Sequence, residues 1–589
     1  MNKDALNKDA MSKAAMKRIN WRFPAAAASL AALSLWWALA QAAPRPLAAL
    51  FPSGALLYLE AKDFRALVAD WNASAERRAW LASANYQVFS RSHLWLRMAD
   101  TQRDFAKAAG VPPDYALLQS VAGGESALAI YDIGKLEFLY ASRLDQARVL
   151  NTTLWRARGT YQTRRAAGVD YYVREDRDSH RTAAFAYSGG LLLAATREDL
   201  VSGALELLAR QTRPSLSREA WFADAVQAAA PGDRDVRLVY NMERLAGSPH
   251  FRSYWVQRNV GDLREFRSGL ADLERVRGEI RERRVLLRPN PAADQTASES
   301  AAGQLLALMP DAAGLYRVWA NPSASQVGLW MNEKLFASGA GPALERRLAP
   351  AVAADGIAGA EQDLEVRIDQ PPLTDDRAGQ AFAELGRQIG AVQLRAMLEL
   401  ENTRVDADQV FVRPQAALVL LADRAWDAAA IRTALTAAAN GLWTSSGLGA
   451  GWRTAATAGA NGVQEMDGLG VLAMAVDGNR LIVGNSTELV NAVLARRTQP
   501  AVAGGVYVAG WKHARELPNF ERISRLIDFP QISPPGQAGA DAAQGREPLF
   551  YSENAASLGR SLGRLDTATI TVHDPGPMLR ETVIYRLNP

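Results

Sequence analysis

The five histidines of the chain are too widely spaced to form a local metal-binding or catalytic motif. No two of them lie within five residues of each other, which excludes the HxxxH and HExxH patterns that place two zinc ligands on one helix face. The segment Asp178-Ser179-His180 contains the residue types of a catalytic triad. Residues adjacent in sequence cannot adopt the nucleophile–base–orienter geometry, so we interpret this segment as a polar turn. The histidines are His93, His180, His250, His513 and His573.

Other patterns with chemical meaning are incomplete. The chain has no cysteine, and therefore no thiolate ligand, disulfide or cysteine nucleophile. Residues 447–451 read GLGAG, without the GxGxxG spacing and without a preceding apolar strand, so we expect a flexible connection and not a nucleotide loop. The acidic group Glu175, Asp176 and Asp178 lacks the spacing and glycine of an EF-hand loop, which favours a solvated turn over a calcium site.

We therefore predict that the chain has no catalytic, cofactor-binding or metal-binding residues and needs no cofactor. The two catalytic carboxylates of a glycosidase have no fixed spacing in sequence by which they could be recognised. A hydrolase with a site assembled from distant residues therefore stays open as an alternative. Twelve of the 15 tryptophans follow residue 43, mostly beside other apolar residues. We expect nearly all of these twelve in the core.

The charge distribution gives no indication of a nucleic-acid-binding face. The net charge is +4 and the isoelectric point about 9.1. The first 22 residues hold six basic and two acidic side chains, which accounts for the whole excess, so the rest of the 589-residue chain is charge-balanced. A composition of 48% apolar and 22% charged residues is typical of a globular protein.

Residues 23–43 carry no charged side chain, and we predict that they form a transmembrane anchor. In a helix this segment would span about 31 Å, close to the thickness of the bilayer hydrocarbon. The positive-inside rule places the basic tail, residues 1–22, in the cytoplasm and the rest of the chain beyond the membrane. The side chains expected to contact the bilayer are Trp21, Phe23, Leu33, Leu35, Trp36 and Trp37.

Two other interpretations of residues 23–43 remain open. The small-residue patterns Ala38-Leu39-Ala40 and Ala40-Gln41-Ala42 would suit a cleaved signal peptide, and an alanine-rich segment could also be a buried helix. The anchor predicts a single-pass protein of the inner (cytoplasmic) membrane, with its N-terminus inside and its body in the periplasm or outside the cell. The expected partners are then the bilayer through residues 23–43 and an envelope protein, but no nucleic acid.

The chain contains an internal repeat, because residues 184–205 align without a gap to residues 473–494. Both segments predict a strand, a tight glycine-containing turn, a second strand and a helix, with Thr196 or Asn485 placed to cap the helix. A collinear set of matches indicates a duplicated module, although generic strand patterning would explain any single match. The further matches are 126–130 with 416–420, 168–169 with 462–463, and 52–58 with 310–316.

If the module is duplicated, matching residues should occupy matching places in the fold. Phe185 and Met474 should then point into equivalent cores, as should Tyr187 and Val476, because a register slip of one residue would turn every side chain over. Leu200 and Leu489 should lie on the helix face that covers the sheet.

The predicted fold class is α+β, with an N-terminal transmembrane helix followed by two related modules of antiparallel sheet with packed helices. The expected divisions are a tail (1–22), an anchor (23–43), a first module (44–300) and a second module (301–589). We expect the modules to lie side by side, joined near 289–300, with a cleft between them as the first place to seek a partner or ligand.

Residues 256–284 have apolar residues at spacings of three and four, which predicts one long amphipathic helix, either docked on its own domain or forming a coiled coil with a partner.

Residues 52–60, PSGALLYLE, followed by Asp63-Phe64, resemble the opening of a group of bacterial envelope proteins known only as domains of unknown function. The strand patterns at 565–570 and 581–585 are similar to the closing strands of that group. The resemblance implies one N-terminal hydrophobic segment and a large α+β body, and it supplies no catalytic residues. We therefore expect a membrane-tethered, extracytoplasmic accessory or scaffold protein that binds another protein or an envelope component, and not an enzyme.

Overall fold

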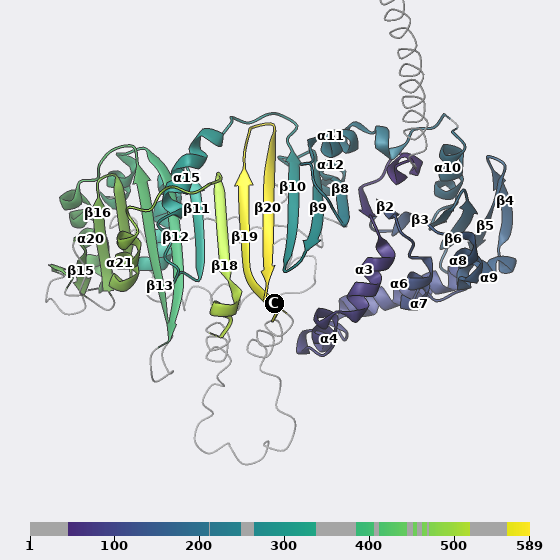
Figure 1. Ribbon diagram of the computed structural model, residues 1–589, viewed down its shortest axis with the longest axis horizontal. Coiled ribbons are helices and arrows are strands. Elements are labelled where there is room, and N and C mark those ends of the chain that lie inside the picture. Colours follow the sequence, from purple (N-terminus) through teal and green to yellow (C-terminus); the bar gives the residue numbers. More distant parts are fainter. Residues whose placement is uncertain are drawn as a thin grey trace, which may run out of the picture.

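The computed structural model describes residues 45–210, 212–248, 264–336, 384–405, 412–443, 451–455, 462–467, 471–518 and 562–588. In this part of the chain twenty β-strands form one sheet, which extends across Figure 1. The N-terminal half contributes β1 (Leu57–Ala61), β2 (Ser126–Asp132), β3 (Glu137–Arg143), β4 (Gln162–Ala166), β5 (Val169–Glu175), β6 (Thr182–Ser188), β7 (Leu191–Ala195), β8 (Val236–Asn241), β9 (Ser268–Val276) and β10 (Glu279–Leu287). The C-terminal half contributes β11 (Leu315–Ala320), β12 (Leu394–Val405), β13 (Val412–Ala422), β14 (Trp452–Thr454), β15 (Gln464–Asp467), β16 (Val471–Asp477), β17 (Arg480–Gly484), β18 (Tyr507–Lys512), β19 (Leu565–His573) and β20 (Met578–Leu587).

Every pairing between neighbouring strands is antiparallel. The pairings give the order β4-β5-β6-β7-β3-β2-β1-β8-β9-β10-β20-β19-β18-β11-β12-β13-β17-β16-β15-β14. The α+β composition with antiparallel strands therefore agrees with the sequence prediction.

The expected arrangement of two separate sheet modules is wrong, because both halves of the chain share one sheet. β10 and β20 lie side by side near the middle of Figure 1 and pair from Glu279 opposite Arg586 to Leu287 opposite Met578. Backbone hydrogen bonds thus join the halves along a full strand length. The sheet is continuous where a cleft between modules was expected.

In the described part of the chain, no helix is long and apolar enough to cross a membrane. The tail (1–22) and the predicted anchor (23–43), with all of its proposed bilayer-contacting side chains, lie outside the described residues. This finding corrects the fold class that included a transmembrane helix. It equally corrects the single-pass, inner-membrane localisation with a periplasmic body, which depended on that helix.

The two halves of the sheet nevertheless have the same strand order when each is followed inward from its outer edge. The series β4-β5-β6-β7-β3-β2-β1-β8-β9-β10 corresponds to β14-β15-β16-β17-β13-β12-β11-β18-β19-β20. The aligned segments both form a hairpin followed by a helix. β6, β7 and α10 (Glu198–Leu208) correspond to β16, β17 and α21 (Thr487–Ala495). The predicted duplication is therefore visible in the strand order, within one sheet and not in two.

The predicted facing of side chains in the repeat is confirmed. Phe185 and Met474 are buried in cores on one side of the sheet, and Tyr187 and Val476 pack on that same side. Leu200 of α10 and Leu489 of α21 are buried against the opposite side. We call the side of Leu200 face A and the side of Phe185 face B.

The long amphipathic helix expected over residues 256–284 is wrong where the structure describes this segment. Residues from 268 onward form the β9–β10 hairpin, whose two-residue turn contains Gly278 at φ 75°. Glycine reaches this left-handed region at little cost, which suits a tight hairpin turn. In a strand, residues three positions apart point to opposite faces of the sheet, so Leu270 points to face A and Leu273 to face B. A strand with apolar residues on both faces thereby mimics a helical stripe. Residues 256–263 lie outside the described residues.

Two details of the repeat also differ from the prediction. Residues 126–130 belong to β2, whereas 416–420 belong to β13, which occupies the place of β3. Neither Thr196 nor Asn485 caps its helix, because α21 is capped by Ser486 and α10 has no side-chain cap. Instead, Thr196 Oγ1 and Asn485 Oδ1 accept hydrogen bonds from backbone N–H groups of the neighbouring strands β3 and β13, at 2.9 and 2.7 Å.

Helices cover both faces of the sheet. Face A carries η1 (Leu47–Leu50), η3 (Leu216–Arg218), α10 and α11 (Ala220–Ala228) in the N-terminal half, and α15 (Glu299–Leu306) and α21 in the C-terminal half. Face B is packed by α7 (Tyr115–Val121), α8 (Gln146–Asn151) and α9 (Thr153–Arg156) on the N-terminal side. On the C-terminal side it is packed by α16 (Ala324–Met331), the π-helical η5 (Asn332–Phe336) and α20 (Ala428–Trp443). The remaining elements are α3 (Phe64–Ala73), α4 (Ala75–Leu81), α5 (Ala84–Phe89), α6 (His93–Ala109), η2 (Ala157–Thr160), α12 (Met242–Gly247) and η4 (Thr296–Ser298).

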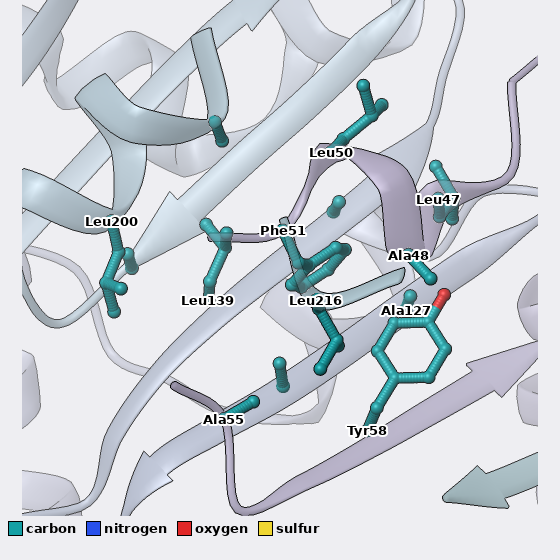
Figure 2. Close-up of a cluster of buried hydrophobic side chains, with 14 of the residues drawn as sticks. Leu47, Ala48, Leu50, Phe51, Ala55, Tyr58, Ala127, Leu139, Leu200 and Leu216 are labelled. Carbon is teal, nitrogen blue, oxygen red and sulfur yellow. The ribbon is translucent and has the colours of Figure 1, made fainter. Parts of the chain in front are cut away.

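The N-terminal core on face A is built around Tyr58 of β1. Figure 2 shows its ring among the side chains of Phe51, Ala127 and Leu216. Phe51 and Phe222 meet this ring edge-on, with ring centroids 5.4 Å away in both cases. Edge-to-face contact is the favoured geometry of aromatic pairs, so this cluster fixes η1 and α11 against the sheet.

Candidate functional site

A helical arm, residues 74–98, follows α3 and comprises α4, α5 and the start of α6. Ser74, Ser83 and Ser92 are the N-caps of α4, α5 and α6, and Ser74 is also the C-cap of α3. Each side-chain oxygen accepts a hydrogen bond from the backbone N–H three residues later, at 3.0–3.2 Å. Each hydroxyl also donates to the carbonyl three residues earlier, at 2.6–2.8 Å. Because each serine bonds a backbone group on both sides of the junction, the chain can change direction between consecutive short helices. α3 and α4 occupy the lower part of Figure 1.

The arm buries very little of its apolar surface. Among those residues of 74–98 whose exposure is described, only Ser83 is buried. Val88, Leu96 and Met98 are 54%, 55% and 52% exposed. Helices as short as α4 and α5 are not stable alone in water and depend on burial of an apolar face. The arm therefore has the surface that a binding partner would cover.

Four aromatic side chains pack against one another within the arm. Trp80, Tyr86, Phe89 and Trp95 contact one another with ring centroids 5.4–6.3 Å apart, mostly edge-on. All four rings remain partly exposed. Trp71, at the base of the arm, is 48% exposed, so the prediction of core positions for nearly all tryptophans fails in this region.

The arm is positively charged. Residues 74–98 contain four arginines and one glutamate. The glutamate, Glu76, lies 3.5 Å from Arg564, a residue of the C-terminal half. Arg77, Arg78 and Arg91 form no ion pair with any described residue, whereas many arginines of the sheet are paired with carboxylates. Arg78 donates to the Ala73 carbonyl at 2.7 Å, and Arg77 lies over the Tyr115 ring at 5.9 Å. The arm thus combines aromatic rings with arginines that have no carboxylate partner among the described residues.

A second candidate site is a charged cluster on face B of the C-terminal half, which we call the Glu399 cluster. Arg317 Nη1 on β11 lies 3.3 Å from Glu399 Oε2 and 3.8 Å from Glu401 Oε1, both on β12. Trp319 Nε1 donates to Glu399 Oε1 at 3.1 Å. Lys334 Nζ lies 3.0 Å from Glu401 Oε1. Alternate residues of a strand share a face, which places both carboxylates on the same side of the sheet.

Burial differs across the Glu399 cluster. The side chain of Glu399 is 10% exposed, whereas those of Arg317 and Lys334 are 38% and 37% exposed. Burial raises the pKa of Glu399, against the opposing effect of Arg317. Tyr507 of β18 packs against Trp319, with ring centroids 4.3 Å apart, and burial raises the pKa of this tyrosine too. A buried carboxylate therefore lies beside an aromatic pair and beneath two accessible cations.

A recess of about 490 Å³ lies beside α10 in the N-terminal half, with Tyr131, Arg197 and Arg213 as its polar wall. Both arginines form ion pairs with carboxylates of the chain at 2.6–2.8 Å. The Tyr131 hydroxyl donates to the Pro52 carbonyl at 2.9 Å, and burial raises the pKa of this tyrosine. The polar groups of the recess are therefore matched within the chain.

The structure places the sequence-predicted segments as follows. Residues 176–180 form a polar turn, in which Asp176 Oδ2 accepts hydrogen bonds from the Ser179 N–H (2.9 Å) and hydroxyl (2.6 Å), and these bonds lower the pKa of Asp176. Residues 447–450 of the glycine-rich segment lie outside the described residues. In the described part of the chain, no group of three His, Asp or Glu side chains is placed to hold a metal ion.

Residues 559–563 read GRSLG, which has the spacing of a nucleophile elbow. That motif needs a strand before its serine and a helix after it. Here β19 begins two residues after the motif, at Leu565, and residues 559–561 lie outside the described residues. The described context therefore does not support an elbow.

Comparison with known proteins gives no family for this chain. No protein-family model matches it, and no curated protein matches it. Among solved structures, crystal forms I, IV and III of TP0453 align at 13%, 14% and 13% identity, with TM-scores of 0.23, 0.24 and 0.25. They cover 42–44% of this chain and 81–85% of TP0453. A likeness with such low TM-scores carries no argument, so function is inferred below from the residues of this chain. The resemblance to bacterial envelope proteins stays a prediction.

The sequence interpretation missed both candidate sites, although each left a signal. Residues 398–401 read LELE, an alternation that places two carboxylates on one face of a strand. Serines at 74, 83 and 92, with aromatic residues between them, mark consecutive short helices. The partners of the carboxylates had no such signal, because Arg317 and Glu399 are 82 positions apart.

Proposed function

We propose that this is a non-catalytic accessory or scaffold protein that binds another protein through its arm, residues 74–98. The observation that supports the proposal is the exposure of Val88, Leu96 and Met98, each more than half exposed on one short helical segment. Single exposed apolar residues are common on protein surfaces. Their concentration on a segment with almost no buried residue is typical of an interaction surface.

The residue types of the arm also suit an interface. Trp, Tyr and Arg carry most of the binding energy in many protein complexes, because they bury large areas and still offer polar contacts. The arm presents Trp80, Tyr86 and Trp95 together with Arg77 and Arg91. Covering these side chains would provide the burial that the short helices lack within the described chain.

The experiment compares two substitutions of the arm with a matched control. Val88→Asp and Leu96→Asp place a charge in the proposed interface. Val502→Asp changes a residue of similar exposure, 49%, in a segment between α21 and β18. Each variant is expressed at equal level in its native cells and purified, and co-purifying proteins are quantified by mass spectrometry.

We expect a protein that co-purifies with the parent chain and with Val502→Asp, and whose recovery falls about tenfold or more with either arm variant. An identical set of co-purifying proteins for all four chains would contradict the proposal. Circular dichroism of each purified variant checks that the fold is retained.

A further inference from the structure

Because the two halves of the sheet have the same strand order, each position of the Glu399 cluster can be compared with a corresponding position in the N-terminal half. Tyr58 of β1 and Tyr316 of β11 occupy the same place in the two halves. In each strand, the residue that follows the tyrosine points to face B. In the N-terminal half that position is Leu59, which pairs with Leu128. In the C-terminal half it is Arg317, which pairs with Glu399.

The correspondence extends over the neighbouring positions of face B. Ile130 pairs with Leu57 in one half, and Glu401 pairs with Leu315 in the other. Val236 pairs with Ala61, and Tyr507 pairs with Trp319. The N-terminal half therefore has an apolar surface of leucine, isoleucine, valine and alanine where the C-terminal half has the Glu399 cluster.

The comparison shows that the fold itself does not need charged residues at these positions. A charge in a mostly buried position is often no more stabilising than an apolar residue of similar volume, even beside an opposite charge, because removing it from water costs about as much as the attraction returns. A stability requirement thus gives a poor explanation for a carboxylate that is 10% exposed.

The chemistry of the cluster indicates the class of ligand. Its two cations, Arg317 and Lys334, are balanced by Glu399 and Glu401, so a charged ligand would leave an unmatched charge in the site. A neutral ligand rich in hydroxyl groups can donate to the carboxylates and accept from the cations without that cost. Trp319 and Tyr507 are half-buried and pack against each other, and the parts of their rings that stay accessible are of the kind on which the C–H face of a sugar ring packs.

We propose that the Glu399 cluster is a binding site for a neutral saccharide. The site is independent of the arm, so the two proposals stand or fall separately. Arg317 and Glu401 contact the ligand directly, since their side chains are 38% and 28% exposed. Glu399, which receives the indole N–H, holds Trp319 in position beneath it.

The test measures binding of three neutral trisaccharides, maltotriose, cellotriose and chitotriose, by saturation-transfer NMR and titration calorimetry on the purified full chain. Inorganic phosphate is titrated in the same way by calorimetry. The variants restore the residues of the N-terminal half. The double substitution Arg317→Leu/Glu399→Leu removes both charges together, and Tyr507→Val removes one ring. We expect saturable binding of at least one trisaccharide, weakened about tenfold or more by either variant.

Thermal unfolding of each variant checks the fold, and Tyr507→Val keeps the test decisive if the double variant fails to fold. Three outcomes would overturn the proposal. One is the absence of saturable binding by all three trisaccharides. The second is binding that neither variant changes. The third is binding of inorganic phosphate at the cluster, lost in the double variant, in place of any saccharide.

Discussion

Arg284 on β10 forms an ion pair with Glu581 on β20, with Nη1 and Oε1 2.7 Å apart, and so joins residues 297 positions apart in the chain. Arg284 also binds both carboxylate oxygens of Glu282 at 2.6 and 2.8 Å. The side chains of Glu282 and Glu581 are only 19% and 20% exposed. One guanidinium therefore holds two partly buried carboxylates at the strand pair that unites the two halves of the sheet.

Replacing Arg284 should weaken this junction. Arg284→Leu leaves the carboxylates of Glu282 and Glu581 without their partner, which should lower the free energy of unfolding by about 1–3 kcal/mol. Urea unfolding followed by fluorescence measures the change. The control is Arg586→Leu, whose side chain is 65% exposed and 4.0 Å from Glu279. This control should change stability by less than about 0.5 kcal/mol, and equal effects of the two substitutions would refute the assignment.

Two helical glycines should respond oppositely to alanine. A Cβ on Gly303 of α15 would lie 2.2 Å from the Val502 carbonyl oxygen, whereas a Cβ on Gly328 of α16 would have no neighbour within 4 Å. We expect Gly303→Ala to destabilise the protein by about 1–3 kcal/mol, because α15 must move away from the chain that crosses it. Gly328→Ala should stabilise it by about 0.4–1 kcal/mol, because alanine loses less backbone entropy on folding. Calorimetric melting curves test both signs.

His513 should make stability depend on pH. It is 2% exposed, neither ring nitrogen has a hydrogen-bond partner in the described part of the chain, and burial lowers its pKa. Below about pH 6.5 the unfolded chain binds a proton that the folded chain does not take up until its lower pKa is reached. Folding stability attributable to His513 is therefore complete above that pH and falls as the pH decreases.

The substitution His513→Met isolates this contribution. Met242, the first residue after β8, holds the corresponding buried place in the N-terminal half. Unfolding free energies of the parent and the variant are compared between about pH 8 and pH 5, across the titration range of histidine. We expect the variant to lose less stability on acidification. Parallel pH curves for the two proteins would show that His513 does not titrate as inferred.

The serine junctions of the arm should control its local stability. Ser83→Ala removes the acceptor for the Tyr86 N–H, at a cost of about 1 kcal/mol in helix stability. Hydrogen–deuterium exchange should then quicken in α5, while the global unfolding midpoint stays the same, because the arm buries little surface. Ser90→Ala is the control, since Ser90 only donates to the Gln87 carbonyl. Equal exchange in the two variants would argue against a capping role.

The parts of the fold that the sequence predicts are those with local signals. The hairpin of β6 and β7 and its repeat in β16 and β17 follow from alternating apolar residues around glycine-containing turns. The β9–β10 hairpin was missed because Leu270, Leu273 and Ile280 serve both faces of a sheet and imitate a helical stripe. Gly278 was the local indication that the helix would be interrupted there.

The joining of the halves and the candidate sites depend on contacts between distant residues. No local pattern indicates that β10 pairs with β20, because each strand could equally end a separate sheet. The Glu399 cluster needs β11, β12 and β18 side by side before Arg317 and Tyr507 reach the carboxylates. The arm was overlooked for a different reason. Its apolar residues have the pattern of a packed helix, and only the structure shows that they are uncovered.

The most direct test of the proposed function is site-specific photo-crosslinking from the arm. A benzophenone amino acid is placed at position 88, or at position 502 as the control, and cells producing the full chain are irradiated. The proposal predicts a discrete crosslinked product with one other protein from position 88, suppressed by Leu96→Asp and absent from position 502. No product from position 88, or the same products from both positions, would contradict the assignment of the arm as the binding surface.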